Sequence, residues 1–264
     1  MTDNRLTGAA LVTGAGKRLG AAMALYLAER GFDVAVHYAS SSSDAEAVAD
    51  RIHALGRKAE TFKADLLEDS ETETLVGRAR SALGPLSVLI NNASIFEYDT
   101  LNTATRESWD RHIQSNLRAP FILTQDFAAQ VSETRTDFNG EPLASGLVVN
   151  MVDQRVRKLT PEFMTYTIAK MGLWAFTQTA AQALAPKIRV NAIGPGPTLR
   201  GGRQSPEHFA KQRAATILGR GADPDGICAA LGYFLESPAI TGQLLCVDGG
   251  QHLSWATPDV VGVE

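Results

Sequence analysis

A chain of 264 residues is long enough for one large α/β domain with a sizeable core, or for two small domains. Apolar residues make up 44% and charged residues 20%, as in soluble globular proteins, and a net charge of −4 argues against binding to nucleic acid or anionic membranes. No apolar run approaches the ~18 residues of a membrane span, and the polar residues 1–5 do not resemble a signal peptide, so a cytoplasmic protein is expected.

The first expected element is a short apolar strand, residues 9–13, which leads into a glycine-rich turn. A run of strong helix formers follows the turn, from residue 21 to residue 30. A strand, a glycine turn and a helix in this order direct free backbone N–H groups and a helix N-terminus at a phosphate. The alternative is a tight turn without a ligand, but the glycine spacing favours binding. The predicted phosphate-binding residues are Gly14, Lys17, Arg18, Leu19 and Gly20.

The end of the second expected strand, residues 33–38, bears on the choice of cofactor. An acidic residue there would bind a ribose diol and repel a 2′-phosphate, but this strand ends without one. Hydroxyl groups follow the strand, and two basic residues lie in the glycine turn, so the sequence predicts NADPH rather than NADH. The alternative is that the serines only cap the next helix, residues 44–55. The residues predicted here are His37, Tyr38, Ser40 and Ser41.

Strands and helices alternate along the rest of the chain. Further strands are expected at 59–64, 86–90, from 147, at 187–193 and at 244–247, and helices at 70–83, 107–118, 121–132, 160–184 and 224–236. Residues 133–145 are expected to form an exposed loop, and residues 197–215 a mobile substrate lid. This alternation predicts a single domain spanning residues 1–264: a Rossmann-type, doubly wound parallel β-sheet with helices on both faces. Cys228 and Cys246 match no metal or disulfide pattern, so no metal site is predicted.

The stretch from residue 147 to residue 170 contains the predicted catalytic pair. Thr160 and Pro161 form a helix start, and on that helix Tyr166 and Lys170 are four residues apart and share one face. An ammonium group near a phenol stabilises the phenolate, so the pKa of Tyr166 is expected to fall from ~10 toward neutrality. The alternative for this spacing alone is a half-buried aromatic ring beside a solvated lysine.

These motifs together resemble the short-chain dehydrogenase/reductase family. The matching pieces are the T-G-x-x-x-x-x-G of 13–20, Asp65, the N-N-A of 91–93, Asn116, Tyr166 with Lys170, Pro195-Gly196 and the D-G-G of 248–250. The resemblance implies hydride transfer from NAD(P)H, with Tyr166 as proton donor, Lys170 on the nicotinamide ribose and Asn116 in a proton relay. It also implies a homotetramer assembled through the last helix and strand. Further cofactor contacts implied by position are Asp65, Leu66, Asn92, Ala93, Ser94, Pro195 and Gly196.

Two residues depart from the general family pattern. Arg18 replaces the middle glycine of the turn, and Asp153 stands where a serine is expected thirteen residues before the tyrosine. A carboxylate there would repel a developing oxyanion, but it suits a substrate that presents ring N–H groups. The residues at these two positions, together with Ser94 and Phe96, resemble those of pteridine reductases. The similarity implies that Arg18, Ser94, Phe96, Asp153 and Tyr166 meet the substrate, with Phe96 stacked on a flat ring.

The predicted function is NADPH-dependent reduction of a dihydropterin or dihydrofolate-like small molecule, with Tyr166 and Asp153 as the proton source. One alternative is a carbonyl reductase of the same family, acting on a 3-oxoacyl, sugar or quinone substrate. Another is a catalytically silent NADPH-binding regulator. Two alternatives remain open for the substrate residues: Arg18 could bind only the cofactor phosphate, and Phe96 could be a plain apolar wall of another pocket. Arg200 and Arg203 could contact an acidic tail of the substrate or lie in solvent.

Overall fold

Seven parallel strands form the centre of the protein. The computed structural model describes residues 6–131, 133–202 and 204–257. The strands are β1 (Ala9–Val12), β2 (Asp33–Tyr38), β3 (Ala59–Lys63), β4 (Leu86–Asn91), β7 (Gly146–Met151), β8 (Ile188–Pro195) and β9 (Leu244–Val247). Their order across the sheet is β3-β2-β1-β4-β7-β8-β9, and every pairing is parallel. This arrangement confirms the predicted doubly wound α/β fold in a single domain.

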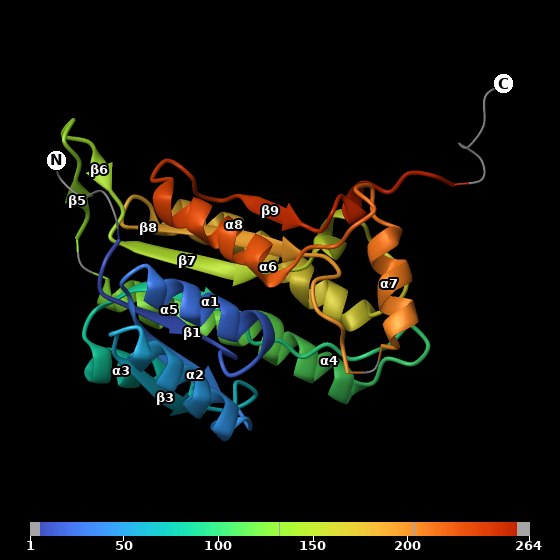
Figure 1. The fold of residues 1–264 in the computed structure, drawn as a ribbon, viewed down its shortest axis with the longest axis horizontal. Helices are drawn as coiled ribbons and strands as arrows, with labels where there is room; N and C mark the ends of the chain where they lie inside the picture. Colours follow the sequence, from blue (N-terminus) through green and yellow to red (C-terminus); the bar gives the residue numbers. More distant parts are fainter. Residues whose placement is uncertain (1–5, 132, 203, 258–264) are drawn as a thin grey trace.

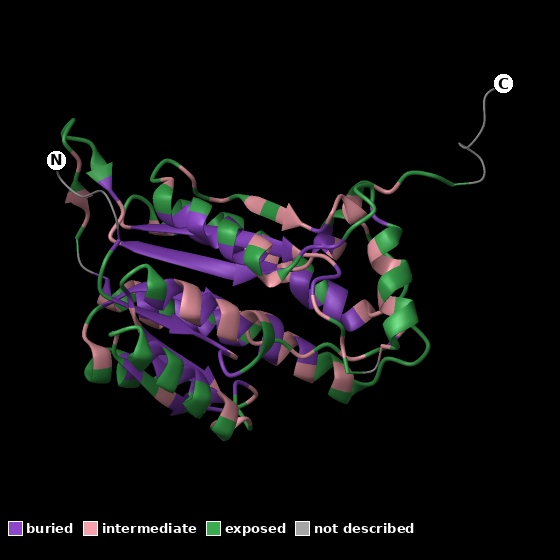
Figure 2. Ribbon diagram, in the orientation of Figure 1, coloured by how far each residue is buried: buried purple, intermediate pink, exposed green. Residues whose placement is uncertain are grey.

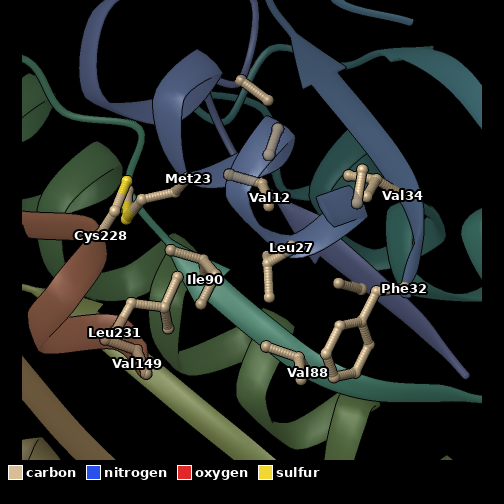
Figure 3. Close-up of a cluster of buried hydrophobic side chains, with 14 of the residues drawn as sticks. Val12, Met23, Leu27, Phe32, Val34, Val88, Ile90, Val149, Cys228 and Leu231 are labelled. Atoms are coloured by element: carbon tan, nitrogen blue, oxygen red, sulfur yellow. The ribbon is translucent and has the colours of Figure 1, made fainter. Parts of the chain in front are cut away.

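Alternating side chains of the central strands build two apolar layers. Ala10 and Val12 point to one face of the sheet, while Ala9 and Leu11 point to the other, because successive residues of a strand face opposite ways. On the first face Met23, Leu27 and Leu231 pack over the strands, as Figure 3 shows around Ile90 and Val149. Both faces are covered by helices, so the strands are apolar along most of their length, as predicted for a parallel sheet.

The helices lie in two layers around the sheet (Figure 1). The first face is covered by α1 (Arg18–Glu29), α2 (Ser42–Ala54) and α8 (Pro224–Glu236). The second face is covered by α3 (Asp69–Leu83), α5 (Ala119–Gln130) and α6 (Met164–Leu184). Two more helices, α4 (Arg106–Ile113) and α7 (Pro206–Ala214), lie beyond the carboxyl ends of the strands. None of the helices in the described ranges is both long enough and apolar enough to cross a membrane.

Three predicted elements differ from the structure. The expected loop 133–145 contains a small antiparallel ribbon of β5 (Arg135–Thr136) and β6 (Pro142–Leu143). The helix expected at 107–118 changes at residue 114 into a π-helical turn, η1 (Gln114–Arg118). The expected end of the next helix at Ser132 lies outside the described residues.

The third difference concerns the start of the catalytic helix. Helix α6 begins at Met164 rather than after Thr160, and its N-cap residue is Phe163 in a left-handed conformation with φ 55°. The Thr160 hydroxyl lies 3.4 Å from the carbonyl oxygen of Glu162 and accepts a hydrogen bond from Arg155. The predicted cap at Thr160 is therefore wrong, because its hydroxyl is engaged within the loop before the helix.

Candidate active site

The glycine turn after β1 is fixed by close backbone contacts. Gly14 has φ 61°, and a Cβ atom at Gly20 would lie 2.1 Å from the carbonyl oxygen of Gly14. The Asn92 side chain donates to the carbonyl oxygens of Thr13 and Gly14, at 2.8 and 3.2 Å. The Thr13 hydroxyl accepts from the backbone N–H groups of Asn92 and Ala93. The N-N-A motif and the glycine turn thus hold each other in place where β1 and β4 end.

His37 supports the same turn from beneath. Its ring is buried, and the backbone N–H of Gly14 donates to Nδ1 at 3.0 Å. Because Nδ1 accepts, the ring proton resides on Nε2, which donates to the carbonyl oxygen of Ala64 at 3.0 Å. Burial lowers the pKa of His37 to about 4, so the ring is neutral at physiological pH. His37, predicted as a cofactor contact, therefore also fixes the glycine turn.

A cleft of about 400 Å³ opens over this turn at the carboxyl ends of β1 and β4. Helix α1 begins beside it with no side-chain cap and no acidic residue in its first turn. Free helix N–H groups next to two basic side chains fit the phosphates of a dinucleotide. The predicted residues that line the cleft are Gly14, Lys17, Arg18, Leu19, Gly20, His37, Asp65, Leu66, Asn92, Ala93 and Ser94.

Several sequence predictions for the cofactor do not match this cleft. Tyr38 is packed against the core, and neither Ser40 nor Ser41 is among the residues lining the cleft; Ser41 occupies the N-cap position of α2 without a capping bond from its hydroxyl. The Lys17 ammonium pairs with Asp44 at 2.8 Å. The cleft is also lined by residues that the sequence analysis missed: Ala39, Leu67, Ile95 and Ser115. Ile95 and Ser115 adjoin Ser94 and Asn116, so only this adjacency pointed to them.

Tyr166, Asp153 and Lys170 meet at the carboxyl end of β7. The Tyr166 hydroxyl donates to Asp153 Oδ2 at 2.9 Å, and Lys170 Nζ donates to the carbonyl oxygen of Met151 at 2.7 Å. The tyrosine is 5% exposed and the lysine 2% exposed. The Lys170 nitrogen lies 5.7 Å from the centre of the tyrosine ring. The predicted alternative of a half-buried ring beside a solvated lysine is wrong, because both side chains are buried.

The acid–base properties of this group differ from the sequence prediction. Burial raises the pKa of Tyr166 well above 10, and the carboxylate of Asp153 raises it further. Burial also raises the pKa of Asp153 above its usual value, and lowers the pKa of Lys170 to about 8. The expected fall of the tyrosine pKa is wrong here, because loss of water and the nearby carboxylate both favour the neutral phenol.

Asn116 lies in the π-helical turn η1 and is fully buried. Its Oδ1 accepts from the Ser94 hydroxyl at 2.6 Å, and its Nδ2 donates to the carbonyl oxygen of Ile95 at 2.9 Å. A single π turn within a helix often marks a functional site, because it displaces side chains from the regular helical positions. Here the turn brings Asn116 to the segment that follows β4.

Phe96 extends this segment into an aromatic cluster. Its ring stacks on Phe163 with centroids 4.3 Å apart and planes 9° from parallel, and it meets the edge of Tyr166 at 4.7 Å. Tyr98 contacts Phe163 edge-on at 5.1 Å, and the Arg155 guanidinium lies 4.8 Å from the Phe163 ring centre. Phe96 remains 43% exposed. Phe163 covers one face of the Phe96 ring.

Arg18 joins the glycine turn to the predicted lid. Its two terminal nitrogens donate to the carbonyl oxygens of Leu199 and Arg200, at 3.0 and 2.8 Å. A second cavity, of about 160 Å³, brings together the predicted residues Arg18, Phe96, Asp153, Pro195 and Gly196. The Arg200 guanidinium donates to the carbonyl oxygen of Gln204, and Arg203 lies outside the described residues.

The D-G-G motif has contacts within the chain. Asp248 accepts hydrogen bonds from the backbone of Gly250 and His252. Gly249 has φ 65°, and a Cβ atom there would lie 2.0 Å from the carbonyl oxygen of Arg220. The motif therefore packs closely against the segment that follows α7. Among the described residues no cluster of three His, Cys, Asp or Glu side chains could hold a metal ion.

Comparison with known proteins places this geometry in context. A family model for short chain dehydrogenases matches residues 8–208. The solved structure of FolM alternative dihydrofolate reductase 1 from Brucella suis, in complex with NADP, is 43% identical with a TM-score of 0.89, covering 96% of this chain and 98% of that one. A 3-oxoacyl-[acyl-carrier-protein] reductase FabG of Staphylococcus aureus is 31% identical over 94% of this chain and 100% of its own length. An uncharacterized oxidoreductase of Mycobacterium tuberculosis is 36% identical over 95% of both chains.

Proposed function

This chain belongs to the short-chain dehydrogenase family, and we propose that it reduces a dihydropterin or a dihydrofolate-like heterocycle at the expense of NADPH. It is an oxidoreductase with NADP as its cofactor, as the family and the NADP-bound neighbours indicate. The pterin substrate is the finer part of the proposal. It rests on one observation above all: the partly buried hydrogen bond of 2.9 Å between the Tyr166 hydroxyl and Asp153.

The cleft over the glycine turn would hold NADPH. The N-terminus of α1 and Arg18 would bind the phosphates of NADPH, and Asp65 would bind its adenine. Asn92 and Ala93 would contact the part of NADPH nearest the sheet. Bound NADPH supplies a hydride to a carbon of the substrate. Lys170 stays largely protonated at pH 7, because its pKa is about 8, and its ammonium would contact the nicotinamide ribose, as in the family it resembles.

Tyr166 and Asp153 would supply the proton. The high pKa of the tyrosine keeps its hydroxyl protonated, so it is a donor at neutral pH rather than a phenolate. The raised pKa of Asp153 allows its carboxyl group to exchange a proton with a substrate nitrogen or with the tyrosine. Protonation of a ring nitrogen leaves no oxyanion beside the carboxylate, which makes this pair suitable for a C=N bond. Ser94, Phe96 and Arg18 would position the heterocycle.

A carbonyl reductase is the second candidate, because FabG, a 3-oxoacyl reductase, is similar over nearly the whole chain. Its reaction develops negative charge on a carbonyl oxygen, which preorganised donors stabilise. In this chain the residue beside Tyr166 is a carboxylate, which accepts rather than donates when ionised. The geometry therefore favours the heterocycle over the ketone.

A catalytically silent regulator is disfavoured by the state of the catalytic group. A protein that only bound NADPH would have no use for a buried lysine, a buried tyrosine and a carboxylate hydrogen-bonded to that tyrosine, because burial costs these groups hydration. We also propose that the protein is located in the cytoplasm and assembles as a homotetramer. Light scattering at micromolar concentration tests the assembly, and a monomer would remove it.

The deciding experiment is Asp153→Ser, assayed by NADPH oxidation with dihydrobiopterin, dihydrofolate and a panel of ketones. If the substrate is a pterin, kcat should fall by ~10²-fold or more, the usual effect of a positioned acid. If it is a ketone, the hydroxyl should leave the rate unchanged or raise it. Tyr166→Phe is the control, since it should abolish turnover of either substrate class. Undiminished activity in Asp153→Ser, with no turnover of any pterin by the unmodified enzyme, would end the pterin proposal.

A further inference from the structure

A buried polar cluster lies behind the catalytic tyrosine and outside the cofactor cleft. Its members are Asp99, His112 and Thr165, which are 2%, 0% and 2% exposed. Asp99 follows β4 at the end of the aromatic segment, His112 belongs to α4, and Thr165 precedes Tyr166 in α6. Buried polar side chains lose hydration, so three together require that their donors and acceptors match one another.

The hydrogen bonds of the cluster form a chain in which each group donates to the next, ending at Asp99. The backbone N–H of Glu97 donates to His112 Nε2 at 3.1 Å, so the ring proton is assigned to Nδ1. Nδ1 lies 2.6 Å from the Thr165 hydroxyl, which in turn donates to Asp99 Oδ2. Burial alone would raise the pKa of Asp99, but the hydrogen bonds from Thr165 and Ser108 hold it below its usual value. The carboxylate is therefore the fixed acceptor at the end of the chain.

Asp99 also caps the catalytic helix. Its backbone carbonyl accepts from the N–H groups of Phe163 and Met164, at 2.8 and 3.4 Å, and its Oδ1 accepts from the N–H of Thr165 at 3.1 Å. Phe163, the N-cap residue, provides no capping side chain. The first N–H groups of an α-helix need partners outside the helix, and here a residue 66 positions earlier in the sequence supplies them.

The cluster links three parts of the active site. Asp99 ends the segment that includes Phe96, and Thr165 adjoins Tyr166. His112 lies one helical turn before Asn116, and its ring meets the Tyr166 ring edge-on at 5.9 Å. None of the three side chains lines the cofactor cleft or the cavity at Asp153. Their contacts instead set the relative positions of the stacking ring, the proton donor and the relay residue.

We propose that Asp99, Thr165 and His112 are positioning residues that hold Tyr166 in reach of a substrate stacked on Phe96. The inference rests on the proposed role of Tyr166 as the proton donor. A misplacement of about 1 Å can cost ~10²-fold in rate even when the residue itself is intact. Loss of this cluster should therefore lower kcat while NADPH, bound over the glycine turn, keeps its affinity.

A matched pair of variants tests the proposal. Thr165→Val keeps the shape of the side chain but removes its hydroxyl, while Thr165→Ser keeps the hydroxyl. We expect Thr165→Val to lower kcat by roughly 10- to 100-fold, with the Kd for NADPH unchanged within about twofold, and Thr165→Ser to restore most of kcat. The measurements are kcat and KM for whichever substrate the unmodified enzyme turns over, NADPH fluorescence titration, and Tm.

Three results would overturn the proposal. The first is a lower Tm for Thr165→Val with native kcat at a temperature where the variant is folded, since that is a merely structural role. The second is equal impairment of Thr165→Ser and Thr165→Val. If Thr165→Val does not fold, Ser108→Ala removes the 3.2 Å hydrogen bond from Ser108 to Asp99, together with the bond that the Ser108 hydroxyl accepts from the backbone N–H of Thr105 at the start of α4, and should lower kcat several-fold; the third overturning result is a native kcat there. Near-native kcat in Tyr166→Phe would instead refute the proposed proton donor.

Discussion

The cofactor side and the substrate side of the active site are built in different ways. Around the glycine turn, the side chains of His37, Thr13 and Asn92 form hydrogen bonds with the backbone groups of the turn and of the segment after β4. On the substrate side, helix α7 has no buried residue, and Figure 2 shows it largely exposed or partly exposed. Arg18 of the glycine turn reaches the lid with two hydrogen bonds, to the carbonyl oxygens of Leu199 and Arg200.

This difference explains why the cofactor is easier to assign than the substrate. A phosphate site made of backbone N–H groups requires glycines at fixed positions, and these leave a mark in the sequence. A lid held by backbone carbonyls and solvent-exposed side chains can vary without disturbing the sheet. Substrate choice therefore depends on the few side chains that line the cavity, above all Asp153.

The largest effect, a loss of NADPH affinity, should come from adding one methyl group to the glycine turn. Gly20→Ala would bring its Cβ within 2.1 Å of the Gly14 carbonyl oxygen and 2.6 Å of Asn92 Nδ2, so the turn must move. Overpacking of this kind costs up to ~3 kcal/mol or more, which corresponds to roughly 100-fold in NADPH affinity. Fluorescence titration of NADPH measures the loss, and Tm reports whether the fold is also weakened.

Gly202→Ala is the matched control in the lid. Apart from its chain neighbours, no atom of the described residues lies within 4 Å of a Cβ built at Gly202, so the free energies of NADPH binding and of unfolding should stay within about 0.5 kcal/mol of those of the unmodified protein. Equal effects of the two variants would show that the two sides are not built differently. A native Kd in Gly20→Ala would mean that the turn is more adaptable than its contacts indicate.

The second expected effect is a loss of folding stability at acidic pH. His37 is neutral in the folded protein with a pKa of about 4, whereas an unfolded histidine has a pKa near 6.5. Because the folded pKa is the lower one, the unfolded state binds the proton more readily, and stability is lost as pH falls below 6.5. The loss attributable to His37 should reach about 2 kcal/mol at pH 5.

Urea unfolding at pH 7 and pH 5 measures this loss. His37→Asn should show a smaller decrease than the unmodified protein, because the titrating ring is gone. His208→Asn is the control, since it removes an exposed histidine of α7 and should keep the full decrease. If His37→Asn lost as much stability between pH 7 and pH 5 as the unmodified protein, the assignment of a neutral His37 ring with hydrogen bonds at both nitrogens would be contradicted.

The sequence predicted those features that depend on local backbone geometry. The seven strands and the glycine turn follow from the alternation of elements and from motif spacing, whereas the proximity of Asp153 to Tyr166 is implied by the family resemblance. The start of α6 could not be found this way, because its cap, Asp99, comes from a distant segment. The direction of the tyrosine pKa also depends on burial and on which group faces the phenol, and neither property is encoded within one helix. The contact of Arg18 with the lid is likewise a consequence of tertiary packing.

The smallest expected effect sharpens the comparison on the substrate side. Phe96→Ala removes the exposed ring on which a flat heterocycle would stack, while leaving the glycine turn untouched. Loss of one aromatic pair is worth about 0.5–1.5 kcal/mol, so KM for dihydropterin should rise roughly 3- to 10-fold, with little change for a small ketone. The Kd for NADPH should stay native. Phe138→Ala, in the turn between β5 and β6 and 76% exposed, is the control for loss of a surface ring. A parallel rise in KM for both substrate classes would indicate a plain apolar wall, because a wall of that kind contributes contact area to any ligand, whereas a stacking ring discriminates in favour of planar ones.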